Sequence, residues 1–360
     1  MKPSIYLSGD VALHGLFDMD REGNPARFEE IAGLFNDSDL HIANLEAIAS
    51  GHSQDEYSGK VHLSTSTEVL AEVIKYLSLK IVNLANNHAL DGGVEGLINT
   101  IGLLDKLGVR HTGAGFKKEH LEPILFSFGN LTIAFAGYVH PGTNPRDEDP
   151  KLFMNYYDPG RIIDQIQTLK HNADRIILSL HWGLDYSNFF TARQQYDARR
   201  FIDSGADIIM GHHPHVVQSI ERYSHGIIFY SLGQICFGDF IWEGKLRALK
   251  RKTKTGILVK FSDSLKIRSV IRTRELAGNR IKILRRKELP EKNSSLYRLN
   301  LLRNRMKLIY YILLIKESLI DRVIEYLFGY YRNPLVQFLS TPFKIRKVRY
   351  LRHDLNESSQ

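Results

Sequence analysis

The sequence has almost no cysteine and no long apolar run. Cys236 is the single cysteine among 360 residues, so neither a disulfide framework nor a thiolate zinc site can form within the chain. No stretch reaches about 20 apolar residues, and the N-terminus "MKPSIYLSGD" turns polar by Ser8, which argues against a signal peptide or a membrane-spanning helix. We therefore expect a reducing, cytoplasmic location, with any metal held by His, Asp, Glu and Asn.

Charge is distributed unevenly along the chain. Residues 1–240 contain 19 Lys and Arg against 30 Asp and Glu, a net charge of −11. Residues 241–360 contain 29 against 10, a net charge of +19. Fourteen of the fifteen histidines lie in the first part, so candidate metal ligands and positive charge occupy different regions.

Short apolar runs alternate with amphipathic segments, which is typical of α/β folds. The expected strands cover residues 4–10, 39–46, 79–88, 131–138, 174–183, 206–215 and 226–234. The expected helices cover residues 25–35, 66–77, 93–108, 160–170 and 193–205, with Ser66 or Thr67 as a cap and Gly108 and Gly205 as stops. Residues 255–275 indicate two further strands around a polar turn at 262–264.

Polar side chains end most of the apolar runs in the first 240 residues. They are Asp10, Asn44 with Glu46, the Asn86, Asn87 and His88 triplet, His181, and the cluster from His212 to His215. In open α/β sheets, side chains beyond the carboxyl ends of the strands converge on one crevice, where ligands bind. These groups are therefore expected to be neighbours in space.

Each of these residues also has an ordinary explanation when taken alone. An aspartate such as Asp10 after a strand is more often a turn or cap residue, and Asn44 with Glu46 could face solvent. His181 could be a satisfied core histidine, and residues 86–88 could be a polar turn. Those explanations do not account for the recurrence of such polar groups at the ends of successive predicted strands. This recurrence favours a metal site.

The spacing of His213 and His215 places two imidazoles on one side of an extended segment, with Pro214 stiffening the turn between them. The six candidate ligands are Asp10, Glu46, Asn87, His181, His213 and His215. Six exceeds the three protein ligands of a usual catalytic zinc site, so a pair of ions sharing a carboxylate is more economical. Mixed nitrogen and oxygen donors suit Mn, Fe or Zn.

A family resemblance appears in these same residues. The motifs that carry it are "SGDVALHG", "IANLEAIAS", "VNLANNHALDGG", "LSLHWGLDY", "GADIIMGHHPHVVQSIERY" and "IIFYSLGQICFGDF". In this order they resemble the successive motifs of the CapA family of capsule and poly-γ-glutamate synthesis, a branch of the calcineurin-like metallophosphoesterases. The resemblance covers about residues 3–280. It implies an α/β fold, a four-layer αββα sandwich with a two-metal site at one edge.

The resemblance also implies roles for individual residues. Asp10 resembles the aspartate ligand of the first motif, Glu46 stands in the place of the bridging carboxylate, and Asn87 resembles the asparagine ligand. His88 is similar to the histidine that protonates the leaving group, and Asp91 to the acid that orients it. The remaining metal ligands that it implies are His181, His213 and His215, with His212 as an alternative.

Several positions depart from the wider phosphoesterase pattern. Ala12 stands where the first motif usually has a histidine, His14 has the wrong spacing to replace it, and Ala89 follows the catalytic histidine in place of an acid. Glu46 replaces the usual aspartate, and Gln234 stands where the family more often has asparagine. These changes resemble CapA-type members and leave open whether the site holds one ion or two.

The resemblance divides the chain into a CapA-like domain, residues 1–290, and a basic helical extension, residues 291–360. Residues 296–339 have helical character, but their longest apolar stretch, "LIYYILLI", is too short to span a bilayer. Such helices could dock on the domain, or they could attract anionic lipid or a polyanionic substrate. No nucleic-acid module is recognisable, so no nucleic acid is expected as a partner.

The leading hypothesis is a metal-dependent hydrolase of CapA type that acts in the synthesis or release of an anionic capsule or poly-γ-glutamate polymer. Water activated by metal would attack a phosphoester, or an amide, with His88 as general acid. The alternative is a non-catalytic accessory scaffold for a membrane-associated polymer synthase. Either protein would be cytoplasmic or peripheral at the inner face of the membrane.

Overall fold

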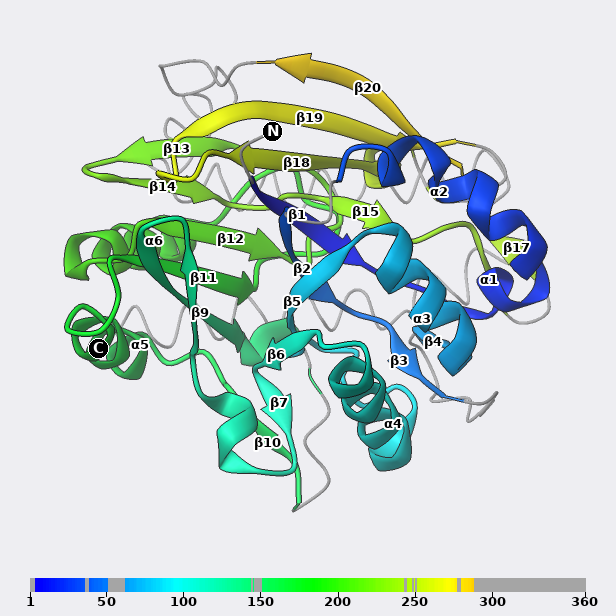
Figure 1. Cartoon of the computed structure of the whole chain (residues 1–360), viewed down its shortest axis with the longest axis horizontal. Helices are drawn as coiled ribbons and strands as arrows, with labels where there is room; N and C mark the ends of the chain where they lie inside the picture. Colours follow the sequence, from blue (N-terminus) through cyan, green and yellow to red (C-terminus); the bar gives the residue numbers. More distant parts are fainter. Residues whose placement is uncertain are drawn as a thin grey trace, which may run out of the picture.

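Two β-sheets lie face to face through the middle of the structure, with helices on both outer sides (Figure 1). The structure is a computed structural model. It describes residues 4–35, 39–50, 62–143, 145, 151–242, 245–247, 249, 251–276 and 280–287.

The first sheet combines a parallel half with an antiparallel half. Its strand order is β20 (Ile281–Lys287), β19 (Ile267–Glu275), β18 (Thr255–Phe261), β1 (Ile5–Val11), β2 (Leu40–Leu45), β5 (Leu79–Asn83) and β6 (Arg110–Thr112). The strands from β1 to β6 are parallel, and β18 to β20 run antiparallel to their neighbours. The short strand β15 (Gln234–Cys236) pairs with the end of β1.

The second sheet is parallel at its centre and antiparallel at both edges. Its order is β13 (Ile220–Tyr223), β14 (Gly226–Phe229), β12 (Ile208–His212), β11 (Arg175–His181), β9 (Leu131–Val139) and β8 (Ile124–Phe128). The three central pairings, β14 with β12, β12 with β11 and β11 with β9, are parallel. The central strands of both sheets therefore bring their carboxyl ends to a common side.

Helices and small strand pairs fill the connections. The α-helices are α1 (Gly15–Met19), α2 (Asn24–Ala32), α3 (Thr67–Tyr76), α4 (Gly93–Lys106), α5 (Pro159–Leu169) and α6 (Ala192–Ser204). The 3-10 helices are η1 (Arg21–Gly23), η2 (Lys118–Leu121), η3 (Pro141–Thr143) and η4 (Arg251–Lys254). The strand pairs are β3 (Ile48–Ala49) with β4 (Ser64–Thr65), β7 (Ala114–Gly115) with β10 (Phe153–Met154), and β16 (Phe240–Trp242) with β17 (Lys245–Arg247).

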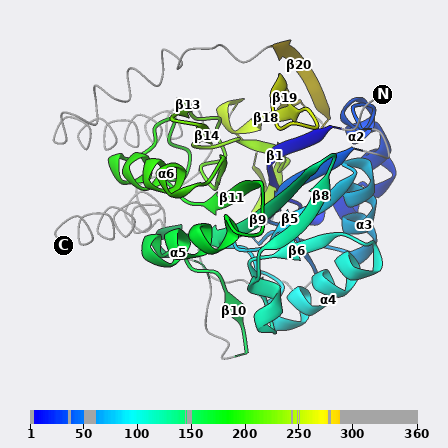
Figure 2. The same ribbon diagram turned by 60° about the vertical axis from the view of Figure 1, so that its left-hand side comes forward.

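Three apolar cores separate the layers. One core lies between the two sheets and includes Leu7 and Ile42 of the first sheet and Phe135 of the second. A second core joins the outer face of the first sheet to α2, α3 and α4, and a third joins the outer face of the second sheet to α5 and α6, which lie side by side in Figure 2. The four layers implied by the family resemblance are therefore confirmed by the order helix, sheet, sheet, helix.

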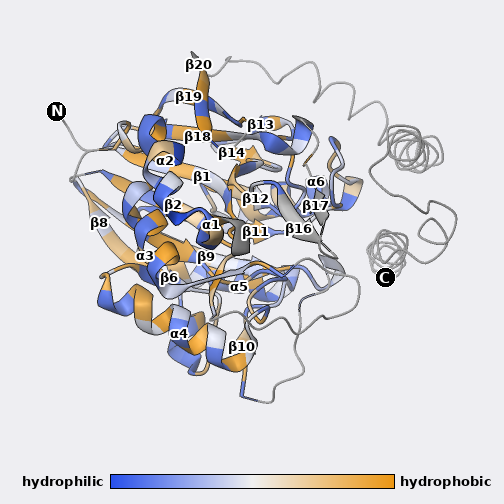
Figure 3. Ribbon diagram, turned by 90° about the vertical axis from the view of Figure 1, so that its right-hand side faces the viewer, coloured by the Kyte–Doolittle hydropathy of each residue, from blue (hydrophilic) through white to orange (hydrophobic). Residues whose placement is uncertain are grey.

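Polar side chains cap the start of two helices, and one of them, Ser66, is a cap that the sequence predicts. The Ser66 side chain accepts a hydrogen bond from Val69 N, and Thr191 forms a capping box with Gln194 at the start of α6. Gly205 follows α6 with a φ of 125°, a conformation that suits glycine. Figure 3 shows apolar and polar residues alternating along α3 and α4, as expected for helices with one face on a sheet.

A bulge in β1 decides which way Asp10 points. Leu7 pairs with Ile42 but Asp10 pairs with Asn44, so β1 contains one more residue than β2 between these two pairs. Before the bulge, Ser8 faces the helices and bonds to His41 Nε2 at 2.7 Å. After it, Asp10 faces the second sheet, where it meets His212.

Gly9 makes this bulge possible. A Cβ atom at this position would lie 2.0 Å from the carbonyl oxygen of Gly233, because the segment that leads into β15 crosses β1 here. Only glycine permits so close an approach of two backbones. The first motif of the sequence, "SGD", is thus a bulge with its close-packed glycine and the aspartate that the bulge turns inward.

The expected strands and helices all appear, with boundaries shifted by a few residues. Strands β6, β8, β13, β15 and β20 of the two sheets, the short strand pairs and helix α1 were not anticipated. The predicted division at residue 290 and the extension at 291–360 lie outside the described residues, the last of which is Lys287. Among the helices of the described residues, none has the length and hydropathy needed to span a membrane.

Candidate metal centre

The carboxyl ends of the central strands of both sheets meet at one place. Asp10 is the last residue but one of β1, and Glu46 follows β2 directly. From the other sheet come His181 at the end of β11 and His212 at the end of β12, whose Cα atoms are partners in the sheet. All four side chains are completely buried. The predicted convergence is present, and it joins two facing sheets rather than the edge of a single one.

Asp10, Glu46 and His181 form a first ligand set. One ligand atom from each residue lies within 4.8 Å of the others. His181 Nε2 is 3.3 Å from Glu46 Oε1. Asn87 extends this set, since its Oδ1 lies 2.8 Å from the same His181 nitrogen.

Asparagines hold these ligands in place. The Asn44 amide donates to Asp10 Oδ1 at 2.9 Å, and Asn44 Oδ1 in turn accepts from Asn83 Nδ2 at 3.1 Å. Asn86 donates to the carbonyl of Leu45 at 2.8 Å and fixes the turn that carries Asn87. The sequence indicated Asn44 and Asn86 as polar strand ends, whereas Asn83 was missed because it lies inside an apolar run.

The three histidines that follow β12 point to different partners. His212 Nδ1 lies 3.0 Å from Asp10 Oδ1, and its Nε2 has no hydrogen-bond partner among the described residues. His215 Nδ1 lies 3.5 Å from Asp10 Oδ2 and 3.9 Å from Glu46 Oε2. His213 Nε2 lies 3.2 Å from Asp185 Oδ1. All three imidazoles therefore face the site.

Asp185, His213 and His215 form a second set of possible ligands, again within 4.8 Å of one another and buried. Asp185 had no role in the sequence interpretation. The only signal for it was its place in "LSLHWGLDY", four residues after His181, in a loop where no strand end marks it.

His88 and Asp91 form a buried pair beside these sets. His88 Nδ1 lies 2.5 Å from Asp91 Oδ2, and the same carboxylate oxygen accepts a hydrogen bond from Leu63 N at 2.8 Å. The His88 backbone N–H donates to Asn86 Oδ1 at 3.0 Å. A carboxylate at Nδ1 holds the proton there and leaves Nε2 as the atom that can exchange a proton with a substrate.

The electrostatics of the first set favour a charged Asp10 and a neutral His181. Burial raises the pKa of Asp10, but the His212 hydrogen bond and charge, followed by the His215 charge, outweigh burial and lower it below 3.8. Burial is the largest cause that holds the pKa of His181 well below 6.5, and His213 lowers it further. A neutral imidazole keeps the lone pair that a metal ligand needs.

The donor set fits divalent metal ions. An ion with ligand bonds of about 2.1 Å places neighbouring ligand atoms about 3.0 to 3.4 Å apart. The atom pairs His181 to Glu46 at 3.3 Å and His213 to Asp185 at 3.2 Å match that separation. Mixed imidazole, carboxylate and amide donors suit Mn, Fe or Zn, and the two buried clusters could bind a metal.

Two residues noted in the sequence do not join the ligand sets. His14 packs against Phe17 and Phe237, and burial lowers its pKa to about 4. Gln234 is the Cα partner of Asp10 and is buried, and its side-chain atoms have no hydrogen-bond partner among the described residues. Neither belongs to the clusters of possible ligands found among those residues.

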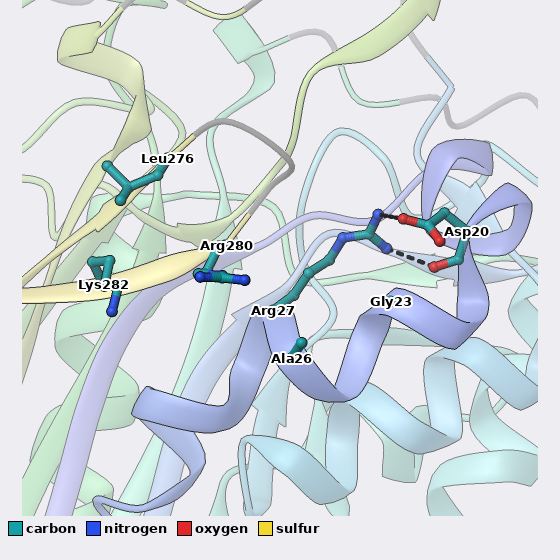
Figure 4. Close-up of a pocket in the computed structure, with 7 residues that line it drawn as sticks. All are labelled: Asp20, Gly23, Ala26, Arg27, Leu276, Arg280 and Lys282. Carbon is teal, nitrogen blue, oxygen red and sulfur yellow. Dashed lines mark hydrogen bonds and ion pairs between the residues drawn. The ribbon is translucent and has the colours of Figure 1, made fainter.

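A cavity of about 420 Å³ lies elsewhere, between α2 and the β19–β20 hairpin (Figure 4). It contains none of the predicted site residues. Its Arg27 guanidinium turns toward Asp20, and Lys282 pairs with Glu30 at 2.9 Å. Its basic character is therefore largely neutralised within the protein.

Residues 4–239 match the family of the bacterial capsule synthesis protein PGA_cap. The chain belongs to this family. Among curated relatives, the PGA biosynthesis protein CapA of Bacillus subtilis is 34% identical over 224 residues, which cover 61% of this chain and 58% of the relative. The capsule biosynthesis protein CapA of Bacillus anthracis is 32% identical over 274 residues, 72% of this chain and 64% of the relative.

The chain thus spans about three fifths of the length of these curated relatives. A more distant relative, named "Probable polyglutamine synthesis accessory protein", comes from Mycobacterium tuberculosis and is 28% identical over 166 residues, 42% of this chain and 43% of that relative. Among solved structures, the 5'-nucleotidase of Candida albicans covers 78% of this chain and 53% of its own, with 11% identity and a TM-score of 0.43. The 5'-nucleotidase precursor of Thermus thermophilus covers 75% and 54%, with 15% identity and a TM-score of 0.40.

Proposed function

We propose that this PGA_cap protein is a metal-dependent hydrolase that acts in the synthesis or release of an anionic capsule or poly-γ-glutamate polymer. The observation that carries the proposal is the combination of a buried ligand set, Asp10, Glu46 and His181, with the His88 and Asp91 pair. A structural metal site would need the first group but not the second. The names of the Bacillus relatives support the polymer as the biological context.

The residues that would hold metal are Asp10, Glu46, Asn87, His181, His213 and His215, as the sequence predicts. A divalent ion bound there supplies an acidified water as nucleophile and neutralises charge on phosphoryl oxygens. The low pKa of Asp10 keeps its carboxylate ionised at neutral pH. The asparagine hydrogen bonds keep the ligand side chains oriented without a contribution from solvent.

His88 performs the proton transfer in this proposal. Its imidazolium carries one proton on Nδ1, held by Asp91, and one on Nε2. As the bond between phosphorus, or carbonyl carbon, and the leaving group breaks, the Nε2 proton moves to the leaving atom. Asp91 stabilises the imidazolium before the transfer and fixes the tautomer after it.

The test is hydrolysis by the Mn²⁺-loaded full chain of bis-(4-nitrophenyl) phosphate and, separately, of poly-γ-glutamate. The His88→Ala variant should lose turnover about 100-fold or more, because general acid catalysis contributes that much. His225→Ala serves as the matched control, since His225 is exposed in the β13–β14 turn. An activity that His88→Ala leaves unchanged would remove the catalytic assignment.

A second candidate function is a non-catalytic accessory scaffold of a polymer synthase. The name of the Mycobacterium tuberculosis relative, which contains the word "accessory", favours it. A scaffold predicts metal binding without turnover of either substrate, and stimulation of a membrane-bound synthase that persists in His88→Ala. The hydrolase predicts that the same variant loses its effect on the polymer.

We also propose that the basic C-terminal extension, residues 291–360, attracts anionic lipid or the anionic polymer itself. Sedimentation of the full chain with vesicles of phosphatidylglycerol and phosphatidylcholine tests the lipid. Binding at low salt that is lost at high salt is expected. No sedimentation at low salt, or equal sedimentation with phosphatidylcholine alone, would contradict membrane attachment.

A further inference from the structure

The loop that carries Asp185 is docked on the histidine turn. Trp182 N donates to the carbonyl of His212 at 3.2 Å, and Tyr186 N donates to the carbonyl of Pro214 at 2.9 Å. The Gln218 side chain closes the other end of the loop by donating to the carbonyl of Ser187 at 2.9 Å. Hydrogen bonds on both sides of Asp185 thus hold its carboxylate against His213.

Strained backbone gathers at the same place. Tyr186, His213 and His215 have φ values of 58°, 91° and 54°, in the left-handed region that favours glycine. They are three of the six non-glycine residues with positive φ in the described part of the chain. Such conformations persist where the surrounding structure imposes them, and they concentrate at ligand sites. This backbone conformation directs the imidazoles of His213 and His215 toward Asp185.

The two ligand sets are neighbours with no residue in common. The rings of His181, from the first set, and His213, from the second, are 4.9 Å apart between centroids. His215, also of the second set, approaches Asp10 of the first at 3.5 Å. Pairs of ions in two-metal sites lie about 3.5 to 4 Å apart, a separation that such adjoining sets can provide.

Charge explains why the second set needs its carboxylate. Without Asp185 it would offer a divalent ion only the neutral imidazoles of His213 and His215. The carboxylates of the first set, Asp10 and Glu46, would then have to balance two ions alone. With Asp185, each set contains at least one anionic oxygen donor.

We propose that Asp185 is a metal ligand and that, with His213 and His215, it holds a second divalent ion beside the one held by Asp10, Glu46 and His181. This inference rests on the metal-binding part of the proposed function. The site would then hold two ions, and one ligand would come from a loop residue that does not lie at the end of a strand. The competing role for Asp185 is a hydrogen bond that orients His213 and binds no ion.

Metal content and Mn²⁺ electron paramagnetic resonance of the full chain distinguish these roles. After loading with Mn²⁺ and desalting, the unchanged chain should retain two ions and give the spectrum of an exchange-coupled pair. Asp185→Asn should retain one ion and give the spectrum of an isolated Mn²⁺. Asp185→Glu, which keeps the carboxylate, should restore the second ion at least in part. Asp164→Asn, at an exposed position of α5, is the matched control and should retain two.

Thermal unfolding in the presence of chelator shows whether Asp185→Asn still folds, and Asp185→Glu provides the readout if it does not. Two ions retained by Asp185→Asn, or a single ion in the unchanged chain, would overturn the inference. A single ion together with turnover that depends on His88 would leave the proposed hydrolase standing. A chain that retains no ion would overturn both.

Discussion

The two sheets contribute different chemistry to one site. From the first sheet and its following loops come oxygen donors, namely Asp10, Glu46 and Asn87, together with the His88 and Asp91 pair. From the second come imidazoles, His181, His212, His213 and His215, and the carboxylate of Asp185. The set Asp10, Glu46 and His181 combines donors from both sheets, so this part of the site depends on the packing of one sheet against the other.

The two sheets also contribute opposite charges to the site. The first sheet brings two fully buried carboxylates, which would repel each other in isolation. The second sheet supplies the hydrogen bond and positive potential that keep the pKa of Asp10 low. The interface between the sheets is therefore an apolar core over most of its area, with a polar edge where the ligands meet.

The largest effect should come from removing the first-sheet carboxylate that contacts most of the second-sheet histidines. Asp10→Asn keeps the shape of the side chain but removes its charge, and Mn²⁺ affinity should fall about 100-fold or more. Titration calorimetry of the full chain measures this. Unchanged affinity would mean that the second sheet binds metal without its partner.

The next largest effect should come from a substitution beside the metal ligands of the first sheet. Asp91→Asn leaves every proposed metal ligand in place but removes the anion that holds the Nδ1 proton of His88. Turnover of bis-(4-nitrophenyl) phosphate should fall about 100-fold, while Mn²⁺ affinity stays the same. A loss of affinity equal to that of Asp10→Asn would show that the pair acts through the metal rather than through the proton.

A smaller effect concerns the stability of the folded state, and it comes from a buried carboxyl on β19 of the first sheet. Burial is the main cause that raises the pKa of Glu275 on β19 to about 7, from a usual 4.5. A raised carboxyl pKa stabilises the folded state fully below pH 4.5, and this contribution is lost as the pH rises through 7. Glu275→Gln should therefore be more stable than the unchanged chain at pH 8 by about 3 kcal/mol.

The gain in Glu275→Gln should disappear below about pH 3.5, where the unchanged side chain is protonated in both the folded and the unfolded state. Urea unfolding at the two pH values measures the difference. Glu95→Gln, at an exposed position of α4, is the matched control. An equal gain at both pH values would contradict the buried, raised-pKa carboxyl.

The smallest effect should come from chelation. Ions that join the two sheets stabilise the folded state by about 2.7 kcal/mol when present at 100 times their dissociation constant. The unfolding temperature of the Mn²⁺-loaded chain should therefore fall on addition of EDTA. Asp10→Asn removes a ligand of the first set only, so its fall should be smaller, and the same shift in both proteins would place the stabilising ion outside the set that contains Asp10.

Most of the fold was accessible from the sequence because strand and helix periodicities are local. The strands that carry Asp10, Glu46, His181 and His212 could all be located in this way, whereas the facing arrangement of two sheets came from the family resemblance. Periodicity could not show that Asp10 faces the second sheet. Simple alternation places Asp10 with Ser8 on the helix side, and only the bulge at Gly9 reverses it.

The sequence allowed a candidate ligand to be predicted where it follows a strand, but not where it lies inside a loop. Asp185 lies in a loop whose path is set by hydrogen bonds to the histidine turn, a tertiary contact that leaves no pattern in the sequence. The direction of His212 could not be settled either, because the turn after it adopts positive φ at His213 and breaks the alternation of the strand. The roles of these residues as ligands remain predictions until metal is measured.

At His213 and His215, the residue type that would be most stable in the backbone conformation differs from the one that binds metal. Glycine would relax the left-handed conformation there, so a chain under selection for stability alone would gain from His213→Gly or His215→Gly. The same changes would delete two imidazoles from the centre. Members of the PGA_cap family that carry glycine at these positions should therefore be those that have given up metal, which makes this turn a marker for sorting binding from non-binding relatives.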